Sequence, residues 1–165
     1  MKIKWLLLFL LLFLALGYFR EFLFVHINRV MYGKYYNMDP YEYEPMPAIM
    51  HVFNKLSYSV LYYLKYPFTI IWTTLFYLLS YITIKKLSTE RIFLKFLTYA
   101  YLALLVLAAC AMAYGYLVNN RLQNDEYTLS RWLLGIAQSP IICLILLAAE
   151  NLYKKSFTNH KNQSL

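Results

Sequence analysis

Charged residues are scarce in this sequence. They make up 15% of its 165 residues, whereas hydrophobic residues make up 61%, and this balance lies outside the range of soluble globular domains. The net charge of +8 does not indicate nucleic-acid binding, because the basic residues are scattered over several loops and do not cluster as in a groove-binding protein. The composition predicts an integral membrane protein in contact with the lipid bilayer, with no nucleic-acid partner.

Residues and motifs for catalysis are also few. The two cysteines, Cys110 and Cys143, both fall inside apolar runs, where a thiol behaves as a small hydrophobic side chain. The three histidines (His26, His51 and His160) do not have the spacing of metal ligands on one face. The sequence contains no Gly-rich phosphate loop, GxSxG or HExxH motif. We therefore expect no enzyme, no catalytic residues, no metal site and no cofactor.

Four apolar runs are long enough to cross a membrane as helices. They cover residues 5–27, 67–84, 92–118 and 132–152. The first run follows Lys2 and Lys4 as in a signal peptide. Cleavage after Gly17 is conceivable, but the apolar character resumes beyond it, and we favour an uncleaved anchor. The sequence predicts an all-α, polytopic membrane protein with four transmembrane helices in a single membrane domain.

The basic residues predict how these helices are oriented. With the N-terminus inside, clusters such as Lys85–Lys86 and Lys154–Lys155 lie in cytoplasmic segments, and most of the acidic residues lie outside. Short loops rich in lysine and arginine stay in the cytoplasm, so both termini are predicted to be cytoplasmic. Glu150, near the inner end of the fourth span, is placed to pair with Lys154 one turn later.

The outside loop, residues 28–66, is the main part beyond the membrane. In its stretch "YGKYYNMDPYEYEPMP", the Asp-Pro and Glu-Pro steps favour extended or turn conformations. Its tyrosines would either present a surface to a partner or a carbohydrate, or rest at headgroup level. Residues 49–66 repeat apolar side chains at three-four spacing, which predicts an interfacial helix before the second span. The polar tail, residues 156–165, is expected to be disordered.

Polar residues at membrane depth mark a candidate functional site. The first helix climbs about 22 Å before it reaches Arg20 and Glu21, in a hydrocarbon core about 30 Å thick, so these charges lie about 7 Å below the outer surface. By the same rise, Gln138 and Ser139 lie about 10 Å below Arg131. The first and fourth helices therefore share a predicted polar layer.

These charges need partners or access to water, because an isolated charge inside the bilayer is costly. The depth-matched pairs are Glu21 with Arg131, or Arg20 with Asp125 or Glu126. Two interpretations remain open. Arg20 and Glu21 either extend to the interface for structural reasons, or form part of a polar docking or ligand site on the outer side.

Pro140 is predicted to kink the fourth helix. It lacks an amide donor, which leaves the carbonyl of Ile136 for Gln138 or Ser139 to satisfy. Pairs of small residues four positions apart allow close approach of helices, so the third and fourth spans are expected to pack antiparallel. The pairs are Ala111 with Gly115 and Gly135 with Ser139.

Two stretches, "FREFLFVHINRVMYGKYY" and "YTLSRWLLGIAQSP", carry a resemblance. With one anchor, a tyrosine-rich loop and three further spans, the chain resembles the small membrane proteins associated with exosortases in Bacteroidota, of the exosortase F and exosortase X systems. The exosortase F type has a tighter spacing between the arginine and the Gln-Pro pair, which here are separated by "WLLGIAQS".

The resemblance implies an accessory subunit in the bacterial inner membrane. Its partner would be an exosortase, the membrane cysteine transpeptidase that processes proteins with a C-terminal sorting tail and is often linked to exopolysaccharide production. The residues that would dock this partner or order the bundle are Arg20, Glu21, Arg131, Gln138 and Ser139.

A small oligomeric transporter or channel subunit is the alternative, with the same polar layer lining a solute site. A pathway needs polar residues that continue to the inner side, whereas the fourth helix there reads "IICLILLAA". The threonines and serine of the second span can bond to their own backbone. We therefore place transport second.

Overall fold

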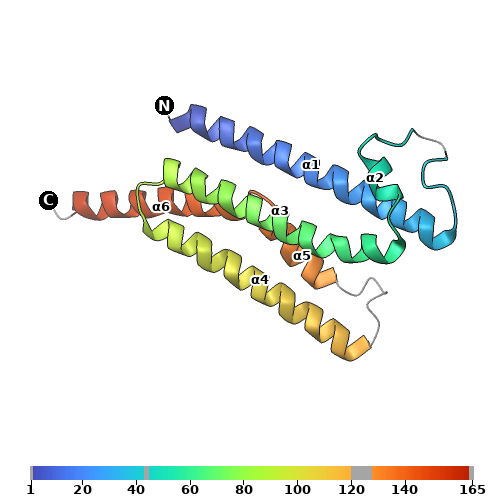
Figure 1. The fold of residues 1–165 in the computed structure, drawn as a ribbon. Helices are drawn as coiled ribbons and strands as arrows, with labels where there is room; N and C mark the ends of the chain where they lie inside the picture. The colour runs from blue at the N-terminus through green and yellow to red at the C-terminus, as the bar shows by residue number, and fades with distance from the viewer. Residues whose placement is uncertain (1, 43–44, 120–127, 164–165) are drawn as a thin grey trace. The chain divides into compact units, whose positions relative to one another are not determined.

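The computed structural model describes residues 2–42, 45–119 and 128–163, which form six helices (Figure 1). These are α1 (Lys2–Tyr36), α2 (Met50–Asn54), α3 (Tyr58–Leu87), α4 (Ile92–Asn119), α5 (Thr128–Ala137) and α6 (Ile141–Gln163). The prediction of an all-α protein is confirmed. Three helices are long and apolar enough to cross a membrane, and α5 with α6 makes a fourth if this bent pair is one span.

Two of the helices are longer than the sequence suggested. α1 continues to Tyr36 instead of ending near residue 27, and α3 begins at Tyr58, so that Pro67 lies inside it. The expected interfacial helix is thereby divided between α2 and the first turns of α3. With 35 residues, α1 is about 52 Å long, which exceeds the roughly 30 Å of a hydrocarbon core. Part of the predicted outside loop is therefore helix.

The chain divides into two compact units, whereas the sequence predicted a single membrane domain. Unit 1 comprises Met1–Phe13 and Thr73–Leu165, and unit 2 comprises Leu14–Trp72. α1 and α3 each continue from one unit into the other. The division arises because unit 2 has a hydrophobic core of its own.

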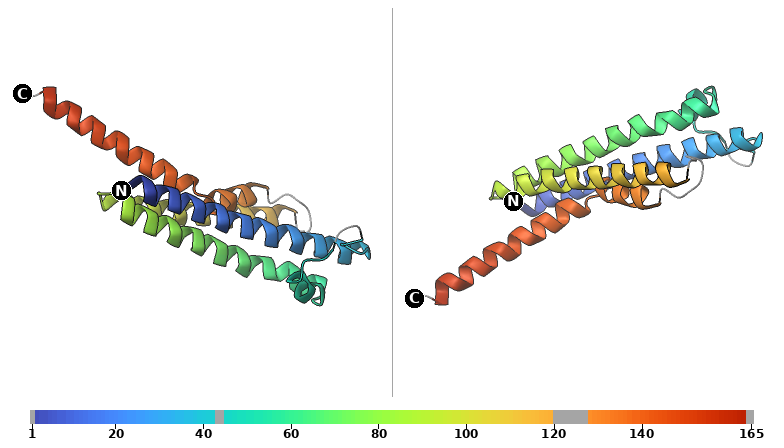
Figure 2. Two further views of the ribbon diagram at one scale, coloured as in Figure 1. Left: turned by 90° about the horizontal axis from the view of Figure 1, so that it is seen from above. Right: turned by 90° about the horizontal axis from the view of Figure 1, so that it is seen from below.

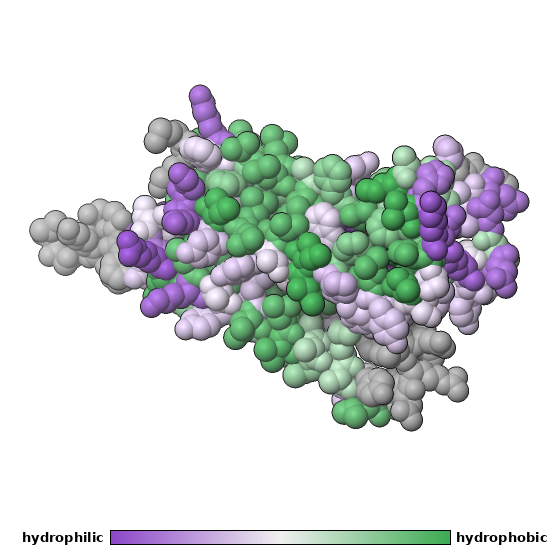
Figure 3. Space-filling view, in the orientation of Figure 1, coloured by the Kyte–Doolittle hydropathy of each residue, from purple (hydrophilic) through white to green (hydrophobic). Residues whose placement is uncertain are grey.

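Unit 1 is a helical bundle with a largely apolar surface. α4 packs antiparallel against α5 and also contacts α6, as expected for the third and fourth spans. Figure 3 shows hydrophobic residues over much of the visible face and hydrophilic residues gathered where α3 turns into α4. Leu102, Val106 and Leu107 are more than half exposed on α4, which is compatible with contact to lipid.

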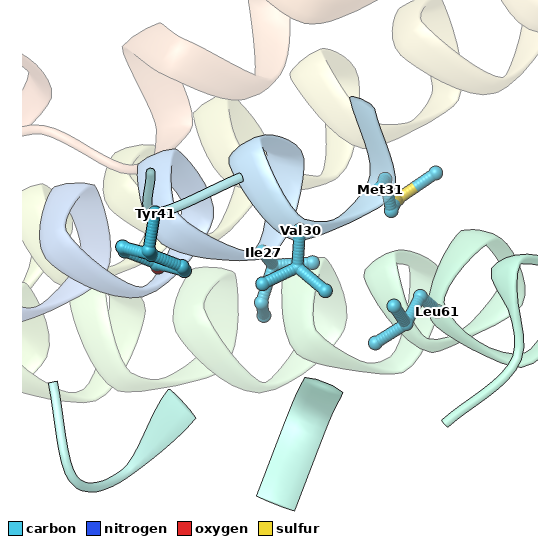
Figure 4. Packing of buried hydrophobic residues seen from close by; sticks show 5 residues of the cluster. All are labelled: Ile27, Val30, Met31, Tyr41 and Leu61. Atoms are coloured by element: carbon cyan, nitrogen blue, oxygen red, sulfur yellow. The ribbon is translucent and has the colours of Figure 1, made fainter. Parts of the chain in front are cut away.

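The core of unit 2 joins α1, the following loop and α3. Its buried members are Ile27, Val30, Met31, Tyr41 and Leu61 (Figure 4). Phe53 of α2 packs against this cluster and contacts Phe68 of α3, with ring centroids 6.1 Å apart. The tyrosine-rich segment is therefore held in place because it packs together with α1, α2 and α3 around this core.

The end of α1 turns the chain back onto the helix. Asn37 has a φ of 54°, and the amide of Met38 donates to the carbonyl of Gly33 at 2.9 Å, which is the six-to-one bond of a Schellman cap. A Cβ on Gly33 would lie 2.8 Å from both the Met38 carbonyl oxygen and Pro40 Cδ. The loop passes so close to α1 that only glycine fits there without movement.

The two ends of the described chain lie at the same end of unit 1. In both views of Figure 2 the N-terminus lies near the α3–α4 turn and the C-terminal part of α6 projects beyond it, and Ile3 and Lys154 line one groove. The expectation of a disordered tail was wrong up to Gln163, since α6 continues that far. Residues 141–163 contain neither glycine nor proline, so nothing in them stops a helix.

Candidate functional site

The break in the fourth span lies at Pro140. α5 and α6 meet there at an angle of 58°. The hydroxyl of Ser139 donates to the carbonyl of Ile136 at 2.7 Å, which replaces the bond that proline cannot make. Both the predicted kink and its local repair are confirmed.

Gln138 lies at this break and points into unit 1. Its side-chain amide donates to the hydroxyl of Thr73 on α3 at 2.9 Å, and the two residues are only 5% and 4% exposed. Removal of one partner would leave a buried polar group unsatisfied, at a cost of about 1–3 kcal/mol. Of its two predicted roles, Gln138 is therefore suited to ordering the bundle.

Thr73 begins a row of buried polar side chains on α3, here called the polar column, whose members are Thr73, Ser80 and Thr83. They lie on one face of the helix because their spacings are seven and three residues. The hydroxyl of Ser80 lies 3.2 Å from that of Tyr101 on α4, and Thr83 donates to the carbonyl of Leu79 at 2.7 Å. The heptad-like spacing was visible in the sequence, but which face turned inward was not.

Glu150 lies near the middle of α6, where this helix meets the α3–α4 turn. It is 3% exposed, and one of its oxygens accepts from the amide of Thr89 at 2.9 Å and from the Thr89 hydroxyl at 3.1 Å. The same oxygen accepts from Lys154 Nζ, so the predicted pairing of Glu150 with Lys154 is confirmed. The carboxylate therefore fastens α6 to the α3–α4 turn.

Arg20 and Glu21 lie on α1 within unit 2 and pair with each other. Arg20 Nη1 is 3.5 Å from Glu21 Oε2, and the side chains are 27% and 67% exposed. The Arg20 guanidinium also lies over the ring of Phe24, 5.8 Å from its centroid. The two adjacent charges thus compensate each other. This local pair was not among the depth-matched pairings that the sequence suggested.

The expected partners of these charges lie elsewhere. Arg131 is an exposed residue of α5 in unit 1, so its pairing with Glu21 and the shared polar layer stay predictions. Asp125 and Glu126 fall outside the described residues. Within unit 1, the structure brings Gln138 and Ser139 together at the Pro140 break.

The small residues of unit 1 differ in what they contribute to packing. Ala111 and Gly115 are half-buried on α4, the helix that packs against α5. A Cβ on Gly135, however, would meet no described atom within 4 Å. Close approach at that point does not depend on glycine, and the expected small-residue packing of Gly135 with Ser139 stays a prediction.

Unit 2 carries a continuous group of tyrosine rings, here called the tyrosine cluster. Rings of α1 contact one another, with centroids 4.5 Å apart for Tyr32 and Tyr36 and 5.0 Å for Tyr35 and Tyr36. Tyr35 continues the contacts to Tyr58 of α3 at 5.8 Å. The full cluster, completed by ring contacts along α3, is Tyr32, Tyr35, Tyr36, Tyr58, Tyr62, Tyr63 and Tyr66.

The tyrosine cluster is exposed, in contrast to Tyr41. Tyr32, Tyr35 and Tyr63 are 61%, 59% and 65% exposed, whereas Tyr41 is 9% exposed. The Tyr41 hydroxyl lies 2.8 Å from His26 Nδ1. From the sequence, Tyr32, Tyr35 and Tyr36 were expected in a loop, and the tyrosines of residues 49–66 in an interfacial helix. The four-residue spacing of Tyr58, Tyr62 and Tyr66 places them on one face of α3. It would have revealed the cluster only if α1 had been predicted to reach Tyr36 and α3 to begin at Tyr58.

Searches against protein families, curated proteins and solved structures find no match to this chain. The relation to exosortase-associated proteins therefore rests on the two sequence stretches and stays a prediction. The described polar residues of unit 1 are arranged to bond to one another across helices, and unit 2 offers an exposed aromatic surface.

Proposed function

We propose that this protein is a non-enzymatic accessory subunit of an exosortase-type system in the bacterial inner membrane, and that it binds its membrane partner through the tyrosine cluster. The observation that carries the proposal is the exposure of a continuous group of contacting rings on a folded support. Tyrosine is enriched at protein interfaces, where its ring supplies contact area and its hydroxyl a hydrogen bond.

The support beneath the cluster favours binding. Tyr58 packs against the buried core of unit 2, and the cap at Asn37 fixes the end of the helix that carries Tyr32, Tyr35 and Tyr36. Rings that are already ordered lose little conformational entropy when a partner covers them. Arg20 and Glu21 lie on the same helix, about three turns before Tyr32, and would add a separate polar contact.

The interior of unit 1 supports a structural role for the buried polar groups. Gln138 is bonded to Thr73, Ser80 to Tyr101, and Glu150 to Thr89 and Lys154. Groups that satisfy one another across helices stabilise a bundle. On this proposal the catalytic residues belong to the partner, and Arg131, an exposed residue of α5, would add a contact to that partner.

The test is site-specific photo-crosslinking in the native host. A benzophenone amino acid is placed at Tyr36, which is 51% exposed in the cluster, and at Tyr99, which is 65% exposed on α4, as the matched control. We expect an adduct with an exosortase-like membrane protein from position 36 and none from position 99. Equal adducts from both positions, or adducts only with a second copy of the chain, would refute the proposal.

A small transporter or channel subunit is the second candidate, and one observation favours it. The polar column and Glu150 extend buried polar groups through unit 1 from the Pro140 break to the α3–α4 turn. We would test this candidate by reconstituting the purified chain in liposomes and measuring its oligomeric state and solute flux. A homo-oligomer whose flux falls with Ser80→Ala would favour transport over the accessory role.

A further inference from the structure

A groove of unit 1 has features that the proposed function does not use. It has a volume of about 400 Å³ and lies between the start of α1, the end of α3 and residues 144–154 of α6. Its walls are mainly aliphatic, with Ile3, Leu6, Leu144 and Leu147 among the lining residues. The volume falls within the range of about 300–1,000 Å³ that is usual for small-molecule sites.

One edge of the groove is polar. Glu150, Asn151 and Lys154 belong to its lining, and Lys154 is bonded to the Glu150 carboxylate. The groove therefore combines aliphatic walls with a polar edge, and a phospholipid likewise combines acyl chains with a polar headgroup.

The surroundings of that edge are basic. Each of the three lining elements carries an exposed lysine next to a lining residue: Lys4 follows Ile3, Lys86 precedes Leu87, and Lys155 follows Lys154. Lys86 also lies over the ring of Trp5, 5.5 Å from its centroid. Tryptophan and lysine at the end of a membrane helix are typical of headgroup level.

From this arrangement we propose that the groove binds one anionic phospholipid of the surrounding bilayer. An acyl chain lies along the aliphatic walls, and the phosphate is held near Lys4, Lys86 and Lys155. Basic pockets between membrane helices are known to hold anionic headgroups, and each nearby lysine strengthens such binding about fivefold.

The experiment uses the full chain purified in mild detergent. Native mass spectrometry counts the phosphatidylglycerol and phosphatidylcholine that remain bound at equal lipid concentrations. We expect the wild-type chain to retain at least about ten times more phosphatidylglycerol than phosphatidylcholine. The double variant Lys4→Gln with Lys86→Gln changes two exposed side chains, so it should keep the fold and lose most of this preference.

A second variant tests the apolar part of the groove. Ala148 lines it, and Ala148→Phe should expel the bound lipid. The matched control is Ala103→Phe, at an exposed alanine of α4 away from the groove. Equal retention of both lipids by the wild-type chain, or unchanged retention by the lysine double variant, would overturn the proposal whether or not Ala148→Phe folds. Binding of an exosortase-like partner is not expected to change in the lysine variant, so this result is separate from the proposed function.

Discussion

Two glycines of α1 should respond in opposite ways to the same substitution. In an unobstructed helix, Gly→Ala stabilises by about 1 kcal/mol. At Gly33 the new Cβ would lie 2.8 Å from the Met38 carbonyl oxygen and from Pro40 Cδ. Neither atom is the end of a flexible side chain, so we take the upper part of the overpacking range, about 3 kcal/mol. We therefore expect Gly33→Ala to destabilise the protein by about 2 kcal/mol after the gain in helix propensity is subtracted.

Gly17 provides the matched control. A Cβ at that position meets no described atom within 4 Å, so Gly17→Ala should stabilise by up to about 1 kcal/mol. Unfolding free energies are measured by tryptophan fluorescence in mixed detergent micelles, and limited proteolysis between residues 38 and 49 reports on the loop. Cleavage should be faster in the Gly33→Ala variant and unchanged in the Gly17→Ala variant. If Gly33→Ala stabilised the chain as much as Gly17→Ala, the close packing of the loop on α1 would be refuted.

Three further predictions concern polar pairs. Gln138→Leu or Thr73→Val alone should each lower the unfolding free energy by about 1–3 kcal/mol, and the double variant should cost less than their sum; additive losses would contradict the bond. Glu150→Gln removes the charge that Lys154 and the Thr89 groups contact. It should lower the unfolding free energy by about 1–3 kcal/mol, and an unchanged unfolding free energy would contradict the role of Glu150 in fastening α6 to the α3–α4 turn. If Glu21 pairs with Arg131, the losses from the two single alanine variants should together exceed that of the double variant, whereas simple additivity would exclude the pair.

Features that depend on neighbours in the chain could be predicted from the sequence. Pro140 cannot donate a backbone bond wherever it stands, so the kink and the role of Ser139 followed from the sequence stretch alone. The pairing of Glu150 with Lys154 likewise follows from the rise of one helical turn. The apolar runs predicted the membrane helices for the same reason, because length and hydropathy are local properties.

Features that depend on tertiary contacts could not be predicted in this way. Glu150 and Thr89 are 61 residues apart, and Gln138 and Thr73 are 65 apart, so no periodicity links them. The end of α1 was placed too early because the first span was taken to end with its apolar run, near residue 27. Helix propagation adds one hydrogen bond per residue regardless of charge, and it stops only where Asn37 adopts its left-handed conformation.

The bond between Glu150 and Thr89 also bears on the order in which the chain is assembled. Thr89 is synthesised 61 residues before Glu150, which corresponds to about 3–12 seconds at a translation rate of about 5–20 residues per second. During that interval α4 is synthesised after α3, while the amide of Thr89 still awaits its acceptor. The helix α6 then supplies a carboxylate together with the lysine that neutralises it. The turn between α3 and α4 is thus closed by a helix that is synthesised later, and premature termination before Glu150 would leave this turn unsecured.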